Sequence, residues 1–338
     1  MKLYGGIDLH SNNSVVHLVD ENGTLVLKKR LANDLAMMLA LLQPYIDSIV
    51  GLVVESTYNW YWLVDGLMDA GYKVHLANTA AIQQYSGLKH GDDDSDANWL
   101  ANMLRLGILP EGYIYPKQQR TLRDLLRKRM QLVQQKTQHM LSIQGLYERH
   151  LNTRLNANTL KQLTSQKIAA AFSDPNTALA VSGNLAVQQC LSEQIKLLEK
   201  SLQQQVKLKD AFIKLTSIDG IGLILALTIM LETGEISRFQ QAGNYASYCR
   251  CVNGARYSNG KKKGASNTKN GNKYLAWAFV EAANFAIRYN ETVKKYYQRK
   301  LARTHMMVAK KTVAHKLARA CFYVLRDNVE FDVNKAFG

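Results

Sequence analysis

The 338-residue sequence has few cysteines and no long apolar run, and each shortage excludes a class of protein. Its four cysteines are irregularly spaced, which argues against a disulfide framework and a zinc ribbon. No apolar run reaches the length of about 18 residues that a membrane span needs. An acid, Asp8, stands where a secretory signal would need apolar residues. We therefore expect a cytoplasmic protein with no membrane partner.

Positive charge, in contrast, is in excess. Lys and Arg together number 43 and Asp and Glu number 27, which gives a net charge of +16. Residues 1–116 hold 7 basic and 13 acidic side chains (net −6), so residues 117–338 hold 36 and 14 (net +22). A net charge of this size indicates a polyanionic partner, most often a nucleic acid. The acidic and basic parts are expected to have different roles.

Residues 1–116 alternate short apolar runs with turn residues. Three strands joined by tight turns predict a meander, and alternating helices and strands follow it. The order β-β-β-α-β-α-β-α is that of the ribonuclease-H-like (RuvC-like) α/β fold. The predicted strands are Leu3–Leu9, Ser14–Asp20, Leu25–Arg30, Ile49–Glu55 and Lys73–Ala77, and the predicted helices are 34–45, Tyr58–Ala70 and Asp96–Leu106.

Four acids occupy unusual positions on this predicted scaffold. Asp8 lies within an apolar strand and Glu55 ends a neighbouring buried strand, where a charge is costly unless it is paired or bound to a cation. Asp93 and Asp96 are three residues apart and share one face of the last helix. Converging carboxylates repel one another unless a hard cation such as Mg²⁺ or Mn²⁺ neutralises them. A solvated acidic turn at a helix start is the alternative interpretation of the second pair.

Residues 117–214 read as a long helical or coiled-coil region. The stretch from Lys117 to about Asn152 has no proline, and residues 184–214 repeat apolar residues at helical spacing. Residues 155–183 are predicted to connect the two. A simple helical bundle is one interpretation, and tracking of a phosphate backbone is the other. Three arginines near the start of the first helix are the candidate phosphate ligands: Arg120, Arg123 and Arg127.

Residues 215–338 are predicted to form a mostly α-helical basic domain. A turn containing Gly220 and Gly222 opens an apolar helix, as in a helix-hairpin-helix whose backbone N–H groups bind a phosphate, although a plain turn is also possible. Residues 253–274 are predicted to be a flexible basic loop, and loops of this length are usually functional. Further helices are predicted at about 273–289, 291–304 and 308–327.

The basic loop offers both nucleophiles and phosphate ligands. Spacing alone does not choose among its three hydroxyl nucleophiles, which are Ser258, Ser266 and Thr268. Lysines beside a nucleophile stabilise the negative charge that develops on a phosphodiester. The candidate nucleic-acid-binding residues of the loop are Arg256, Lys261, Lys262, Lys263 and Lys269.

Five short motifs follow one another along the chain. They are Gly6-Ile7-Asp8, Val54-Glu55-Ser56-Thr57, Asp93-Asp94-Ser95-Asp96-Ala97, Ser217-Ile218-Asp219-Gly220-Ile221-Gly222, and Arg256-Tyr257-Ser258 continuing to Gly264-Ala265-Ser266. In their order and spacing the sequence resembles the DEDD transposases of the 110/1111 group of insertion sequences, relatives of the Piv-type DNA invertases. The resemblance covers nearly the whole length.

The resemblance implies a catalytic site built from two domains. It implies a metal-binding tetrad of Asp8, Glu55, Asp93 and Asp96 in a RuvC-like domain, residues 1–116, with Mg²⁺ or Mn²⁺ as cofactor. It implies that the nucleophile is Ser258, eight residues before the serine of the Gly-Ala-Ser element, in a transposase domain, residues 215–338. Such enzymes cut and rejoin DNA through a covalent serine–DNA intermediate.

The resemblance also implies partners. Members of the family pair a structured bridge RNA, made by their own element, with donor and target DNA. They act as homo-oligomers, here a dimer or a tetramer, in the prokaryotic cytoplasm at the nucleoid.

Two positions depart from the family's pattern. Asp219 replaces a proline and places an acid at the predicted phosphate turn, and Asp92 competes with Asp93 as the third acid. Two other classes of function stay open on the residues themselves. One is a metal-dependent endonuclease of the Holliday-junction-resolvase kind that uses water, and the other is a non-catalytic nucleic-acid-binding protein.

Overall fold

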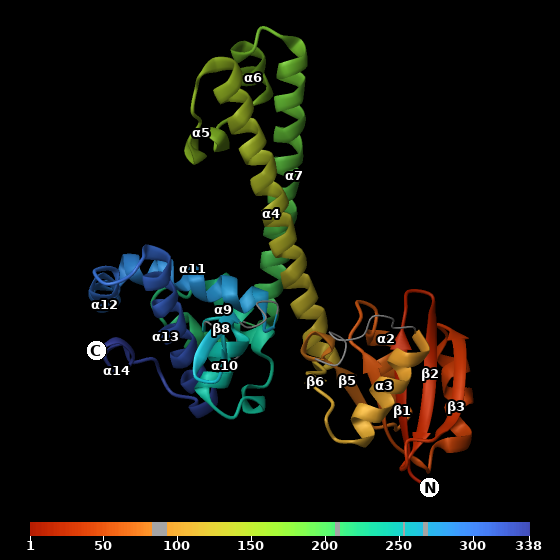
Figure 1. Ribbon diagram of the computed structural model, residues 1–338. Coiled ribbons are helices and arrows are strands. Elements are labelled where there is room, and N and C mark those ends of the chain that lie inside the picture. Colours follow the sequence, from red (N-terminus) through yellow and green to blue (C-terminus); the bar gives the residue numbers. More distant parts are fainter. Residues whose placement is uncertain (83–92, 207–209, 253, 266–269) are drawn as a thin grey trace. The chain divides into compact units, whose positions relative to one another are not determined.

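The computed structural model describes residues 1–82, 93–206, 210–252, 254–265 and 270–338 (Figure 1). The chain divides into two compact units, Met1–Lys117 and Gln118–Gly338. Each unit has hydrophobic clusters of its own. None of the helices in the described ranges is long and apolar enough to pass through a membrane.

The first unit is built on a six-stranded mixed sheet with the order β3-β2-β1-β4-β5-β6. The first three strands form an antiparallel meander, β4 and β5 continue the sheet parallel to β1, and β6 is antiparallel to β5. This confirms the predicted α/β class of the N-terminal part. The strands are β1 (Leu3–Leu9), β2 (Asn13–Asp20), β3 (Leu25–Ala32), β4 (Ile49–Glu55), β5 (Val74–Ala77) and β6 (Glu111–Gly112), and the helices are α1 (Leu35–Leu42), α2 (Tyr61–Asp69) and α3 (Asp93–Arg105).

Helices cover both faces of the central strands. Successive strand residues point to opposite faces, so Val54 packs with the α2 residue Leu63 while Val53 packs with the α3 residue Leu100. A strand buried on both faces is apolar throughout, which is why β4 has no polar alternation.

Gly6 determines how closely α3 approaches β1. A Cβ atom at Gly6 would lie 2.0 Å from the carbonyl oxygen of Ala97 and 2.6 Å from the backbone nitrogen of Ala101. Helix backbone therefore rests directly on strand backbone. Because Asp8 is two residues after Gly6 and Asp96 immediately precedes Ala97, this contact brings the segments that carry both acids together.

The second unit begins with a long antiparallel helix pair, α4 (Lys117–Leu151) and α7 (Pro175–Val206). Arg129 binds Glu199 and His139 binds Asn184, which fixes the antiparallel register. Between the two helices lie α5 (Ala157–Lys161) and α6 (Ser165–Ala171). They close an apolar cluster at the end of the pair (Figure 1), formed by Ile143, Tyr147, Leu160, Ile168 and Val181 with their neighbours.

Residues 155–183, predicted to connect the two long helices, hold two short helices and the first turns of α7, which begins nine residues earlier than the predicted 184. Asp174 caps α7, accepting a hydrogen bond from the Thr177 backbone nitrogen at 2.9 Å. Proline at the first position of a helix loses no hydrogen bond, so Asp174-Pro175 marks a helix start.

The remaining helices form the C-terminal domain around a core that includes Tyr245, Phe279, Phe322 and Phe337. The three long predicted C-terminal helices are present, with ends that differ from the prediction by up to three residues. The helices are α8 (Asp210–Thr216), α9 (Leu223–Thr233), α10 (Ala242–Tyr248), α11 (Lys273–Tyr289), α12 (Glu291–Leu301), α13 (Met306–Asp327) and α14 (Val333–Phe337).

The predicted flexible basic loop is partly wrong, because it contains an antiparallel hairpin, β7 (Ala255–Ser258) with β8 (Lys261–Ala265). Asn259 and Gly260 form its two-residue turn with φ values of 49° and 71°. Positive φ at both positions is what the tight turn of a hairpin requires, and Asn-Gly is the residue pair that best tolerates it. The Asn-Gly signal was present in the sequence but was outweighed by the lack of apolar residues.

Candidate active-site residues in two units

Asp8 and Glu55 lie side by side in the first unit. Their strands are parallel neighbours, and the register pairs Ile7 with Val54, one residue before each acid. Asp8 is only 2% exposed. Asp96, in the first turns of α3, lies near enough to act electrostatically on Glu55. Three of the four predicted acids therefore gather at one place.

The pKa of Glu55 records this crowding. Burial raises the pKa of Glu55 to about 8, and its hydrogen bond with Asp8 and the negative charges of Asp8 and Asp96 act in the same direction. A carboxyl group in this setting holds a proton at neutral pH unless a cation replaces it. The cluster thus has the electrostatic character of a cation site.

His10 is a neighbour of Asp8 that belongs to none of the sequence motifs. Its Nε2 lies 3.1 Å from Asp8 Oδ2. Its backbone carbonyl accepts hydrogen bonds from the side chains of Asn33 at 2.9 Å and Asn59 at 3.0 Å, which hold the turn after β1 in place. The only signal in the sequence is its position two residues after Asp8.

The fourth acid cannot be placed beside the other three. Asp93 begins α3, but its side chain and the whole of Asp92 lie outside the described residues. Within the described part of the chain, no three His, Cys, Asp or Glu side chains are arranged as a metal-binding group. The three acids that are described fit a hard cation by their chemistry, and a complete ligand set requires a further donor.

Ser258 lies in the second unit, at the end of β7 and next to the hairpin turn. It pairs with Lys261 across the hairpin, and both residues are exposed. Lys263 is exposed on the same hairpin. The side chains of Arg256 and Lys262, and the whole of Ser266, Thr268 and Lys269, lie outside the described residues.

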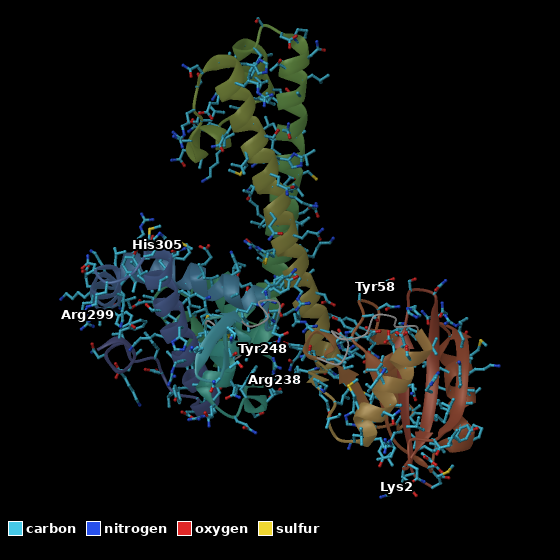
Figure 2. All side chains as sticks on the ribbon, in the orientation of Figure 1. Lys2, Tyr58, Arg238, Tyr248, Arg299 and His305 are labelled. Atoms are coloured by element: carbon cyan, nitrogen blue, oxygen red, sulfur yellow. The ribbon has the colours of Figure 1, made fainter. Side chains whose placement is uncertain are left out.

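The two ends of the hairpin segment are tied together at the end of α10. The Arg250 guanidinium donates to the carbonyls of Asn270 at 3.0 Å and Gly271 at 2.9 Å. The backbone nitrogen of Asn272 donates to the Tyr248 carbonyl at 2.6 Å. Tyr248 in turn lies under the Arg238 guanidinium, 4.5 Å from the ring centre (Figure 2). These contacts hold the two ends of the segment that carries Ser258 close together.

A partly buried ion pair binds Asn272 at the end of this segment. Glu232 on α9 is fully buried, and both its oxygens accept hydrogen bonds from Arg127 on α4, at 2.6 and 2.8 Å. The Asn272 side chain donates to Glu232 at 2.7 Å while its oxygen caps α11, accepting from the backbone nitrogens of Tyr274 and Leu275. One carboxylate thus joins two helices and the start of a third.

The predicted phosphate ligands of α4 are engaged in the fold. The Arg127 guanidinium is committed to Glu232 and lies 4.5 Å from the Tyr274 ring centre. Arg120 and Arg123 are 4% and 5% exposed. A helical spacing of basic residues does not reveal which of them face the core, and a partner 105 residues away in the sequence is invisible to it.

The predicted Gly-x-Gly turn joins α8 to α9. Gly220 has a φ of 93°, and a Cβ there would lie 2.4 Å from the Ala282 carbonyl oxygen of α11, so this glycine serves packing. Gly222 precedes the exposed N-terminus of α9, and nothing lies within 4 Å of the position of its missing Cβ. Asp219, the departure from the family's pattern, accepts a hydrogen bond from Asn290 at 2.6 Å. Its carboxylate is therefore drawn toward α12.

Comparison with known proteins agrees with both halves of the chain. A family model described as a transposase with a DEDD motif matches residues 5–150, and a model described as the IS116/IS110/IS902 transposase family matches residues 214–298. A protein of Pseudomonas aeruginosa described as a family 20 transposase is 22% identical over 95% of this chain and 96% of its own length. A Sinorhizobium fredii protein described as transposase y4qE is 25% identical over 70% of this chain and 58% of its own length.

The two models match the two regions that carry the acids and the serine hairpin, and one of the relatives aligns along almost the full length. The chain therefore belongs to the IS110 family of insertion-sequence transposases, enzymes that recombine DNA.

Proposed function

We propose that this transposase cuts and rejoins DNA with Ser258 as its nucleophile and with the acids of a ribonuclease-H-like first unit as a cation site. The observation that carries the second part is the gathering of Asp8, Glu55 and Asp96, where burial first, and then the neighbouring acids, raise the pKa of Glu55 to about 8. The strand order, with a meander extended by two parallel strands, supports the ribonuclease-H-like assignment.

The acids would hold Mg²⁺ or Mn²⁺ through Asp8, Glu55 and Asp96, with Asp93 as the fourth ligand. Such an ion, when bound, supplies charge stabilisation at a scissile phosphate. The chain's own contribution is to hold three carboxylates together against their repulsion. The Gly6 contact and the two neighbouring strands that carry Asp8 and Glu55 do this.

Ser258 is suited to nucleophilic attack because it is an exposed hydroxyl next to the hairpin turn, paired with Lys261 across the strands. Its Oγ forms a bond to the phosphorus as the bond from phosphorus to the leaving strand's oxygen breaks. That oxygen leaves as a hydroxyl, carrying the proton that the serine gave up. A hydroxyl of a second strand then reverses the step, releases the serine and joins the strands.

The family resemblance extends the proposal to the partners. We propose a bridge RNA as guide, donor and target DNA as substrates, and a dimer or tetramer as the active assembly. RNA that copurifies with the protein and derives from the DNA beside its gene would support the guide. Purified protein that recombines DNA after complete RNase treatment would contradict it.

The decisive experiment for the chemistry is capture of a covalent protein–DNA adduct on a denaturing gel. Wild-type protein with labelled donor DNA and Mg²⁺ should give a slow band, Ser258→Ala should give none, and the exposed control Ser237→Ala should resemble wild type. Asp8→Asn should lose the adduct but keep DNA binding, whereas the surface variant Asp69→Asn should lose neither. Free DNA ends without an adduct would instead favour the hydrolytic, resolvase-like endonuclease. An adduct with Ser258→Ala would exclude this serine.

A further inference from the structure

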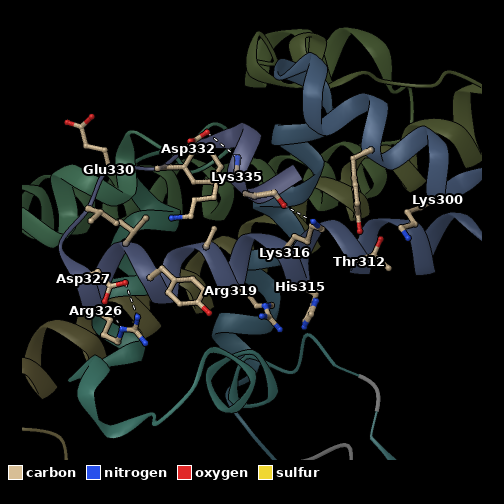
Figure 3. Close-up of a pocket in the computed structure, with 17 residues that line it drawn as sticks. Lys300, Thr312, His315, Lys316, Arg319, Arg326, Asp327, Glu330, Asp332 and Lys335 are labelled. Atoms are coloured by element: carbon tan, nitrogen blue, oxygen red, sulfur yellow. Dashed lines mark hydrogen bonds and ion pairs between the residues drawn. The ribbon is translucent and has the colours of Figure 1, made fainter. Parts of the chain in front are cut away.

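A cationic hollow in the C-terminal domain is not used by the chemistry proposed above. It has a volume of about 1010 Å³ and lies between α13, the end of α12 and the C-terminal segment (Figure 3). Basic side chains dominate one wall, namely Lys300, His315, Lys316 and Arg319. Figure 3 shows His315 and Arg319 extending to the same side of α13.

Lysines and arginines outnumber acids among the residues that line the hollow. Within the described residues, no carboxylate forms an ion pair with Lys300, Lys316 or Arg319. Three acids line the opposite wall. Asp327 binds Arg326 at 2.6 Å and Asp332 caps α14, whereas Glu330 is exposed. Positive charge collected without a partner stabilises a bound anion.

The pKa of Lys316 reflects the same imbalance. Burial lowers the pKa of Lys316, and the positive charges of Lys300, Arg299 and Arg319 lower it further. Its ammonium group donates to the Ala336 carbonyl at 2.7 Å and lies 5.0 Å from the Tyr296 ring centre. An anion entering the hollow would relieve this repulsion.

Aromatic rings accompany the cations. Tyr323 on α13 lines the hollow and is 40% exposed. Tyr323 follows Arg319 by one helical turn, so the ring and this cation lie on the same wall, and the Arg326 guanidinium lies 5.1 Å from the ring centre. Cations that hold a phosphate together with aromatic rings that stack on bases are the combination found in sites for single-stranded nucleic acid.

The hollow continues toward the serine hairpin. A second hollow of about 460 Å³ shares Thr312 and His315 with the first and is also lined by Cys251 and Val252. Val252 lies three residues before β7, which carries Ser258. The two hollows thus adjoin along α13, and the second is lined by residues that precede the hairpin in the sequence.

We propose that the hollow on α13 binds a nucleotide of a single-stranded nucleic acid, with its phosphate at Lys300 and Arg319 and its base against Tyr323. The site goes beyond the proposed chemistry, since it needs neither Ser258 nor the acids. A duplex does not fit this proposal, because its bases are stacked on one another and are not free to stack on the tyrosine.

The test measures binding of fluorescent single-stranded 12-mers, rU12 and dT12, to the full chain without Mg²⁺. The variant Lys300→Gln/Arg319→Gln removes two cations of the hollow. Its matched control, Lys295→Gln/Arg303→Gln, removes two exposed cations of the same region that do not line it. We expect the hollow variant to bind roughly tenfold more weakly than the control, with a salt dependence lower by about one phosphate contact.

Tyr323→Ala tests whether a base stacks on the Tyr323 ring. It should weaken single-strand binding roughly 5- to 100-fold, as loss of one stacked base does, with little change of the salt dependence. Thermal melting checks that each variant is folded. Loss for rU12 alone identifies the strand as RNA, loss for dT12 alone identifies it as DNA, and both outcomes support the site. Equal losses in hollow and control variants, or an equal loss for a blunt duplex, would overturn it.

Discussion

At the scale of single residues, the acids of the first unit are the most informative. Asp8 is buried beside His10. Glu55 is partly buried, forms a hydrogen bond with Asp8 and lies near the negative charge of Asp96. A protein evolving only for stability would replace such a cluster, because desolvated carboxylates repel each other. Their presence in the first unit is understandable if a cation is their normal neighbour.

The pH dependence of stability tests this view. The folded pKa of Glu55, about 8, exceeds its ordinary value of 4.5. Its contribution to stability is therefore complete below about pH 4.5 and is lost as pH rises through 8. In metal-free protein we expect the melting temperature of the first unit to fall between pH 6 and pH 8.5, more than in Glu55→Gln. Mg²⁺ should raise it more at pH 8.5 than at pH 6. An identical pH profile in Glu55→Gln would contradict the assignment.

At the scale of elements, one glycine couples a strand to a helix. Gly6 is the position at which α3 touches β1 without an intervening side chain, and the acids lie on either side of that contact. The geometry of the acidic cluster thus depends on a residue that has no functional group.

Gly6→Ala should therefore damage the first unit. Its Cβ would meet backbone atoms of α3, which cannot rotate away as a side chain can, so we expect a loss of about 1–3 kcal/mol in the free energy of unfolding. The matched control is Gly145→Ala in α4, where nothing lies within 4 Å of the added atom and a gain of up to about 1 kcal/mol is expected. Urea unfolding of both variants measures the difference. A neutral Gly6→Ala would show that α3 moves away freely.

The elements also show what the sequence could predict. The sequence predicts strands β1 to β5 and helices α4, α9 and α11 with ends that differ by a few residues at most from the structure. The spacing of apolar residues and runs of β-branched residues are local signals, so they can be recognised without the fold. Strand β6 has two residues and exists only through its pairing with β5. The acids could be proposed because charge inside an apolar strand is conspicuous, whereas Glu232 sits in a helix where its burial depends on Arg127, far away in the sequence.

At the scale of the molecule, the division of charge has a structural counterpart. The acidic segment corresponds to the unit that ends at Lys117, and the basic remainder forms the second unit. The partly buried pair of Arg127 and Glu232 joins the long helix α4 to the C-terminal domain inside that second unit.

Removing one partner of this pair should destabilise the second unit alone. The Glu232 carboxylate is fully buried but the Arg127 side chain is 32% exposed, so Arg127→Ala should cost about 2–3 kcal/mol, less than the loss of a partner from a fully buried pair. Arg326→Ala breaks an exposed pair with Asp327 and should cost no more than about 1 kcal/mol. Hydrogen exchange of α9 and the N-terminus of α11 locates the effect. Equal costs for the two variants would contradict the anchoring role.

The contact between Arg127 and Glu232 fixes one point of α4 and leaves a long stretch of the helix beyond it. From Arg127 to its end at Leu151 the helix is about 36 Å long, at 1.5 Å per residue. A tilt of about 10° at the anchor would displace the far end, where α5 and α6 pack, by about 6 Å over that length. Because Glu232 also binds Asn272, which follows the segment that carries Ser258, such a tilt at Arg127 would also move the start of α11.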